Sequence, residues 1–146
     1  MRHLEDFAVG DVIKGGSLTV DAAMIKEFAA KYDPQPFHLD EAAAEATFFK
    51  GLAASGWHTA ALTMRLIVES GVAVSGGVIG AGGTINWPKA LRPGETIRLE
   101  SEILEVRPSK SRPDRGMIKV RFTTYDSTGD VVQVLVADLV APRRSA

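Results

Sequence analysis

The stretch from Trp57 to Ser70 is apolar on nearly every side, and it constrains the fold more than any other segment. Its apolar residues are Trp57, Ala60, Ala61, Leu62, Met64, Leu66, Ile67 and Val68. A helix with this pattern is normally buried in a core and not laid on a surface. It would be only about 20 Å long, too short to cross a bilayer. The sequence therefore predicts a single buried helix inside a globular protein.

Two shorter helices are expected before this segment. Apolar residues recur at helical spacing over 21–31, and this helix should end at Tyr32-Asp33 because a proline follows. Asp40 can cap a second, short helix over 41–46.

The pattern changes to strands after the long apolar helix. Alternation over 97–103 and 118–123 predicts two half-buried strands, the first followed by a bulge where the hydrophobic phase shifts. Residues 126–130 form a hairpin turn, and the mostly apolar stretch 131–140 should be a central strand. Shorter strand pieces are expected at 12–13, 18–20, 78–79 and 84–87. Helices gathered early and strands gathered late predict one α+β domain over residues 1–146, with an antiparallel sheet.

Composition narrows the classes of function. A net charge of −1 argues against binding nucleic acid or a membrane surface, which needs clustered positive charge. Without cysteine there is no disulfide framework, thiolate nucleophile or cysteine-ligated metal, and the three histidines are too scattered for a metal cluster. The N-terminus lacks the apolar core of a signal peptide. We therefore expect a cytoplasmic enzyme or binding protein without a metal.

The segment between the two early helices holds the one close carboxylate–imidazole pair of the chain, Asp33 and His38. Pro34 and Pro36 fix φ and donate no backbone hydrogen bond, so we expect a rigid, extended bridge. A carboxylate and an imidazole that reach one water molecule can divide acid and base roles between them. Judged by residue types alone, the more ordinary interpretation is that Asp33 ends a helix and that His38 is a loop histidine with a hydrogen-bond partner.

The motif Asp33-x-Gln35-Pro36-Phe37-His38-x-Asp40 resembles that of the MaoC-like, (R)-specific enoyl-CoA hydratases, which is Asp-x-Asn-Pro-aliphatic-His-x-Asp. Gln35 stands where Asn is usual, and Phe37 stands where an aliphatic residue is usual. The resemblance covers nearly the whole chain in element order, with motif-grade matches over 32–56. It implies the hotdog fold, in which an antiparallel sheet wraps around a central buried helix.

The resemblance also implies a reaction and roles for residues. Asp33 would activate water and His38 would protonate C2, so that a trans-2-enoyl-CoA becomes an (R)-3-hydroxyacyl-CoA with no metal or redox cofactor. Ala54-Ser55-Gly56 stands where the family has Ala-His-Gly at the start of its central helix, so the Gly56 N–H would form the oxyanion hole. The alternative is a glycine that starts a helix before a close packing contact. Gln35 would orient Asp33 or its water, and a solvent-facing loop amide is an equally ordinary interpretation. Such folds form homodimers in which two sheets join, with the active site near the interface.

Several further residues are candidates for binding the substrate. Trp57, Phe48 and Phe49 could line the acyl pocket together with Ser55, although packing is the more ordinary role for the aromatic residues. His58 could face the site, but a core histidine is the simpler interpretation. The basic connector 107–116 could meet the phosphates of coenzyme A, and a solvated hairpin loop is again simpler.

Two rival functions remain open. A hotdog acyl-CoA thioesterase would direct water at the thioester carbon instead of the alkene, and active-site geometry decides between the two reactions. A non-catalytic acyl-CoA or acyl-carrier binding module would bind without turnover, because a fold alone does not establish function.

Overall fold

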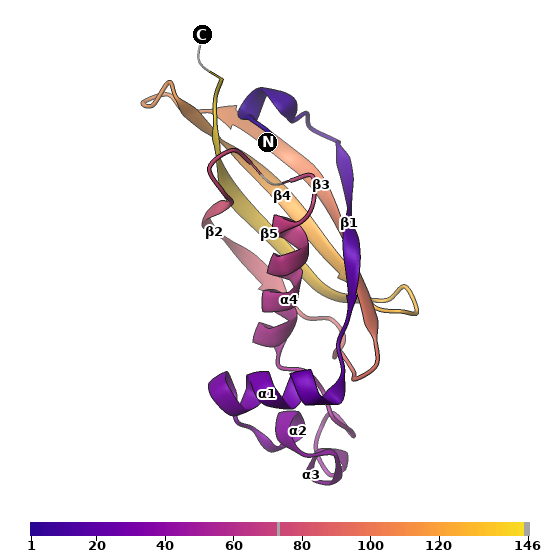
Figure 1. The fold of residues 1–146 in the computed structure, drawn as a ribbon. Coiled ribbons are helices and arrows are strands. Elements are labelled where there is room, and N and C mark those ends of the chain that lie inside the picture. Colours follow the sequence, from indigo (N-terminus) through magenta and orange to yellow (C-terminus); the bar gives the residue numbers. More distant parts are fainter. Residues whose placement is uncertain (73, 145–146) are drawn as a thin grey trace.

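The computed structural model of the protein describes residues 1–72 and 74–144 of the 146-residue chain. Five strands form one antiparallel sheet in the order β1-β3-β4-β5-β2, and helix α4 lies along one face of it (Figure 1). The strands are β1 (Val12–Thr19), β2 (Ile79–Asn86), β3 (Thr96–Pro108), β4 (Arg115–Tyr125) and β5 (Val131–Pro142). The helices are η1 (Leu4–Asp6), α1 (Ala22–Tyr32), α2 (Pro36–Leu39), α3 (Glu41–Glu45) and α4 (Gly56–Val68). This is the hotdog arrangement of the α+β class, as predicted.

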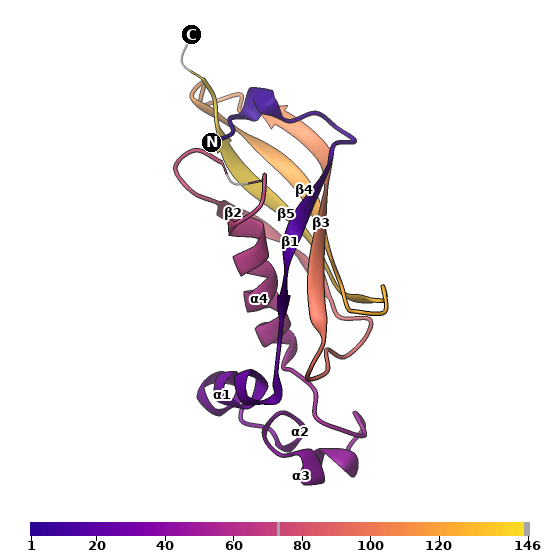
Figure 2. The ribbon, with the colours of Figure 1, turned by 45° about the vertical axis from the view of Figure 1, so that its right-hand side comes forward.

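Helices α1, α2 and α3 gather at one end of the sheet, and both termini lie at the opposite end (Figures 1 and 2). Asp21 caps α1, and Asp40 caps α3 as expected, because their carboxylates accept hydrogen bonds from backbone N–H groups at 2.8 Å and 2.9 Å. Helix α1 ends at Tyr32, as predicted, one residue before the Asp33-Pro34 step. Among the described residues, no helix has both the length and the apolar character that a membrane crossing needs.

The bridge between α1 and α3 is not extended throughout, and that prediction is wrong. Residues Pro36–Leu39 form one helical turn, α2. Pro36 opens this turn, where its fixed φ suits a helix and its missing N–H costs no hydrogen bond. Gln35 keeps an extended backbone, as expected for a residue that precedes proline. The turn brings His38 back toward Asp33.

The strands follow the predicted alternation. In β3 and β4 every second residue is buried on the face that carries α4: Ile97, Leu99, Ser101, Ile103, Ile118, Val120, Phe122 and Thr124. A bulge between Ile103 and Glu105 confirms the predicted phase shift. The predicted pieces near the N-terminus form one strand, β1, and those around the glycine-rich run form β2. Strand β5 is interior, between β4 and β2, while β4 occupies the middle of the sheet.

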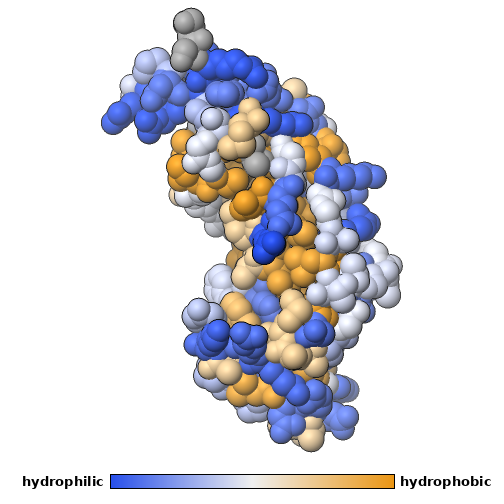
Figure 3. All heavy atoms as spheres, viewed as in Figure 1, coloured by the Kyte–Doolittle hydropathy of each residue, from blue (hydrophilic) through white to orange (hydrophobic). Residues whose placement is uncertain are grey.

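Helix α4 is buried on only one side in the single chain, contrary to the prediction. Its inward face consists of His58, Thr59, Thr63, Leu66 and Ile67. On the outward face, Trp57 is 62% exposed and Val68 is 52% exposed. The sheet covers the helix from one side only, and apolar residues consequently gather across the middle of the open face (Figures 2 and 3).

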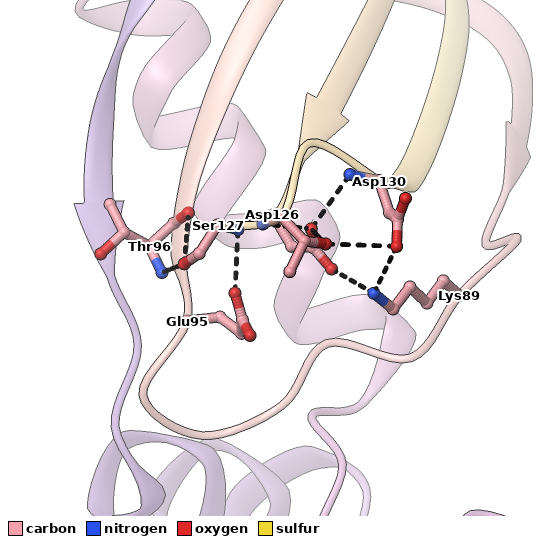
Figure 4. A network of polar contacts seen from close by, with 7 residues as sticks. Lys89, Glu95, Thr96, Asp126, Ser127 and Asp130 are labelled. Atoms are coloured by element: carbon pink, nitrogen blue, oxygen red, sulfur yellow. Dashed lines mark hydrogen bonds and ion pairs between the residues drawn. The ribbon is translucent and has the colours of Figure 1, made fainter.

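A polar network ties the β2–β3 connection to the β4–β5 hairpin (Figure 4). The Lys89 ammonium lies 2.7 Å from Oδ2 of Asp126 and 2.8 Å from Oδ2 of Asp130. Asp126 is buried, and its other oxygen accepts hydrogen bonds from the Thr128 hydroxyl and from the backbone N–H groups of Thr128 and Asp130. Burial raises the pKa of Asp126, but these partners outweigh it and lower the pKa to about 2.

Replacing Asp126 with Asn tests the contribution of this network. We expect Asp126→Asn to lower the free energy of unfolding at pH 7 by about 1–3 kcal/mol, because hydrogen bonds to a buried charge are lost. The pKa in the folded protein, about 2, is below the ordinary 3.8. The ionised carboxylate therefore stabilises the fold fully above about pH 4, and its contribution fades as the pH falls toward 2.

Urea unfolding at pH 7 and pH 3 measures this contribution. The stability difference between wild type and Asp126→Asn should shrink at the lower pH. Glu45→Gln, which removes an exposed carboxylate on α3, is the control and should change stability little at either pH. A difference for Asp126→Asn that is unchanged between the two pH values would contradict the assignment.

Candidate active site

The structure brings Asp33 and His38 together at the end of the sheet that carries the short helices. His38 Nε2 lies 3.3 Å from Oδ2 of Asp33. Asp33 ends α1 and His38 lies in α2, so the Pro34 bend and the Pro36 turn fix their separation. The His38 side chain is 6% exposed and that of Asp33 is 18% exposed. The imidazole of the pair is therefore inside the protein, and the carboxylate is partly accessible to solvent.

A main-chain carbonyl determines which nitrogen of His38 carries a proton. His38 Nδ1 lies 2.6 Å from the carbonyl oxygen of Ala53, in a buried position. A carbonyl can only accept a hydrogen bond, so Nδ1 must donate. The Ala53 N–H in turn donates to the carbonyl of Phe37 at 3.0 Å, which holds the two segments together. Nε2 is therefore the atom that can gain or lose a proton, and it faces Asp33.

The surroundings of Asp33 favour its ionised form. Burial raises its pKa, but hydrogen bonds from the Gln35 and Ser55 side chains, together with the nearby His38, outweigh this and lower the pKa below its ordinary value. The Gln35 amide donates to Oδ1 of Asp33, while Oδ2 faces His38. At neutral pH the site thus contains a carboxylate that can accept a proton.

The N-terminus of α4 begins beside this pair. Ser55 is buried and caps the helix, accepting a hydrogen bond from the Trp57 N–H at 3.3 Å. Gly56 is the first helical residue, and its N–H has no hydrogen-bond acceptor within residues 1–72 and 74–144. Because Ser55 also contacts Asp33, this free N–H and the positive end of the helix dipole lie next to the carboxylate–imidazole pair. The arrangement can stabilise an oxygen that becomes negatively charged.

The lack of a side chain at Gly56 has a structural reason in the close packing of this residue against Trp87. A Cβ at this position would lie 2.7 Å from Cε2 of Trp87, too close for any real contact. The indole of Trp87 is itself held in place, because its Nε1 donates to Oε1 of buried Gln133 at 2.9 Å. Packing against Trp87 therefore requires glycine at this position, in addition to the role that the resemblance implies for its N–H.

The three aromatic candidates are placed differently. Phe49 lies at the site, with its ring centroid 6.0 Å from that of His38, and Phe37 packs edge-on against His38 at 4.5 Å. Phe48 is 93% exposed and packs edge-on against Phe49, with ring centroids 5.7 Å apart. Trp57 lies on the outer face of α4, where it and β2 line an open groove of about 340 Å³. In a single chain only Phe49 of the three lies against His38.

Two further candidates from the sequence show no contact with the pair in the described part of the chain. His58 is buried and stacks on Phe28 with ring centroids 4.6 Å apart, and burial lowers its pKa. The turn between β3 and β4 lies at the end of the molecule opposite α1, α2 and α3, so the basic connector is remote from His38 within one chain (Figure 1). Across the described part of the chain, no cluster of three or more His, Asp or Glu side chains is arranged to hold a metal ion.

Sequence reasoning also missed Arg92, whose guanidinium donates to the main-chain carbonyls of Phe49, Gly51 and Leu52. The nearby Pro93-Gly94 marks a turn. The sequence predicts a turn there, but it does not indicate that this turn contacts the segment before α4.

Comparisons with known proteins identify the family of this chain. The MaoC like domain family model matches residues 6–114. The uncharacterized protein YdeM of Bacillus subtilis is 33% identical over 126 residues, which are 84% of this chain and 86% of that protein. The crystal structure of a MaoC-like dehydratase from Rhodospirillum rubrum is 50% identical, with a TM-score of 0.97 over 100% of both chains. The R-hydratase PhaJ1 from Pseudomonas aeruginosa is 26% identical, with a TM-score of 0.75 over 97% of this chain and 86% of that one. The protein therefore belongs to the MaoC-like domain family.

Proposed function

We propose that this protein catalyses the reversible hydration of a trans-2-enoyl-CoA to an (R)-3-hydroxyacyl-CoA. The observation that carries this proposal is the ionised Asp33 at 3.3 Å from His38 Nε2, beside the free N–H of Gly56. A similar dehydratase from Rhodospirillum rubrum and a similar R-hydratase from Pseudomonas aeruginosa support the reaction class and the configuration.

In the proposed reaction each step of the addition belongs to one group. Asp33 takes a proton from water as the water oxygen bonds to C3, and protonated His38 delivers the Nε2 proton to C2 as the C2–C3 π bond breaks. Negative charge that develops on the thioester oxygen is stabilised by the Gly56 N–H and by the positive end of the α4 dipole. One water is added, and the reaction balances without a metal or a redox cofactor.

The pair can return to its starting state without another residue. After the addition, Asp33 carries a proton and His38 Nε2 lacks one. The two atoms face each other at 3.3 Å, so the proton can pass back between them once product leaves. The Nδ1 proton, which is donated to the Ala53 carbonyl, takes no part in this exchange.

Hydration of crotonyl-CoA by wild type and by dyad variants tests the proposal. We expect wild type to remove the absorbance of the conjugated thioester without releasing free thiol. Asp33→Asn and His38→Gln should each lower kcat by about 100-fold or more, because each removes a proton-transfer group. His3→Gln is the matched control, since it makes the same change at a histidine outside the site, and it should keep wild-type kcat.

Two other results would overturn the hydratase assignment. Thiol release that depends on Asp33 would identify a thioesterase. Binding of acyl-CoA that survives both dyad substitutions, with no turnover of short, long or branched enoyl-CoAs by wild type, would identify a binding module.

Gly56→Ala tests the coupling between the helix N-terminus and Trp87. The added methyl group must displace either the indole or the first turn of α4, so we expect a loss of about 1–3 kcal/mol in unfolding free energy and a lower kcat. Gly16→Ala in β1 is the control, because its Cβ would meet no atom within 4 Å. Urea unfolding and crotonyl-CoA hydration provide the two measurements, and equal stability of Gly56→Ala and Gly16→Ala would contradict the packing argument.

We also propose that the protein forms a homodimer through β2 and the outer face of α4. Strand β2 lies at the sheet edge, hydrogen-bonded only to β5, and the groove beside Trp57 is continuous with it. Unpaired backbone at an edge and an open apolar face can both be covered by a second copy of the chain. The apolar residues of this face lie over α4, where Figure 3 shows them gathered. Such a dimer would cover Trp57, which follows Gly56 directly.

Light scattering after size exclusion tests this arrangement. We expect twice the chain mass of 15.6 kDa for wild type and a monomer for Val68→Lys, because a charge would be buried in the interface. Val12→Lys is the matched control, since Val12 is also exposed but lies on β1 at the opposite edge of the sheet. A monomeric wild type, or dissociation by Val12→Lys and not by Val68→Lys, would refute the proposed interface.

A further inference from the structure

The connection between β2 and β3, residues 87–95, contacts the segment before α4 at several points. The Leu91 carbonyl accepts a hydrogen bond from the Ala54 N–H at 2.8 Å, and Trp87 packs against Gly56. Arg92 lies between these contacts and the strand that follows. This connection therefore touches the segment that supplies both main-chain groups of the candidate active site.

Arg92 alone donates three hydrogen bonds to this segment. Its Nη1 donates to the carbonyls of Gly51 at 3.0 Å and Leu52 at 3.2 Å, and its Nη2 donates to the carbonyl of Phe49 at 2.5 Å. The backbone here is irregular, with positive φ at Lys50 and Gly51, so these carbonyls point together and lie outside any helix or strand. A planar guanidinium with several fixed donors suits three convergent acceptors better than an ammonium does.

The segment held by Arg92 leads directly into the site. Leu52 is followed by Ala53, whose carbonyl accepts the Nδ1 proton of His38, and then by Ser55 and Gly56. A shift of the Leu52 carbonyl would therefore move the acceptor that orients the His38 ring. It would also move the start of α4.

The connection that carries Arg92 is bound by the β4–β5 hairpin at residues before and after Arg92 (Figure 4). On one side, Lys89 pairs with Asp126 and Asp130. On the other side, the Ser127 N–H donates to the Glu95 carboxylate at 2.8 Å, and the Thr96 N–H donates to the Ser127 hydroxyl at 2.8 Å. Because the hairpin belongs to the sheet, these contacts transmit the rigidity of the sheet to Arg92.

We propose that Arg92 is a positioning residue for the active site. It acts through the 49–56 segment, keeping the Ala53 carbonyl on His38 Nδ1 and the Gly56 N–H beside Asp33. It does not itself contact substrate. The kinetic part of this inference rests on the proposed hydratase function, whereas the orientation of His38 can be observed without any turnover.

The test compares Arg92→Met and Arg92→Lys with wild type and with Arg121→Met. Arg121 pairs with Glu102 on the outer face of the sheet, so Arg121→Met removes a guanidinium elsewhere. Side-chain nitrogen NMR of histidine-labelled protein reports the tautomer of each of the three histidines, and His38→Gln assigns the His38 signals. Circular dichroism at the same temperature verifies that each variant is folded.

For Arg92→Met, we expect the Nδ1–H form of His38 to lose its dominance and kcat for crotonyl-CoA to fall by up to about 100-fold, with KM little changed. Arg92→Lys should restore part of both signals, and Arg121→Met should match wild type. A folded Arg92→Met with wild-type His38 signals would overturn the proposal, whether or not wild type hydrates crotonyl-CoA. If Arg92→Met does not fold, Arg92→Lys decides: wild-type His38 signals and kcat in that variant would overturn the proposal.

An inactive wild type whose His38 tautomer still changes in Arg92→Met would refute the hydratase function and leave the positioning role in place. The two proposals therefore fail independently.

Discussion

The packing of one face of α4 against the sheet is the contact on which the rest of the structure depends. It fixes where the helix begins, so that Ser55 and Gly56 stand beside Asp33 at the end of α1. Because a single sheet covers only one side of a helix, the opposite face keeps Trp57 and Val68 in solvent. One contact thus determines the place of the candidate active site and the apolar surface available to a second copy.

The candidate active site depends on main-chain groups as much as on side chains. The carbonyl of Ala53 fixes the proton on Nδ1 of His38, and the N–H of Gly56 supplies a free donor. Main-chain groups have no side-chain torsions of their own, so only their surroundings can orient them. Trp87 and Arg92 provide those surroundings, since one packs on Gly56 and the other binds three carbonyls just before it. The connection 87–95 therefore orients the main-chain groups of the candidate active site.

That connection is anchored to the hairpin between β4 and β5. The hairpin after β4 binds it through Lys89 at one side and through Glu95 at the other, so a loop with little regular structure acquires a fixed course. Functional loops commonly derive their geometry from a rigid scaffold in this way. Here the anchoring pair, Lys89 and Asp126, lies outside the candidate active site, and its contribution is to stability.

The sequence by itself determined the elements whose signals are local. Periodicity and capping located α1 and α3, alternation located β3 and β4, and the 33–40 motif identified Asp33 and His38 as a pair. Only the tertiary structure decided that residues 36–39 close into a helical turn and that α4 is open on one side. It also decided that Trp87 and Arg92 hold the segment before α4. The last two features arise from contacts between segments far apart in the chain, and a local periodic pattern does not encode which distant segments meet. The helical turn at 36–39 is local, but it is too short to produce a periodic pattern.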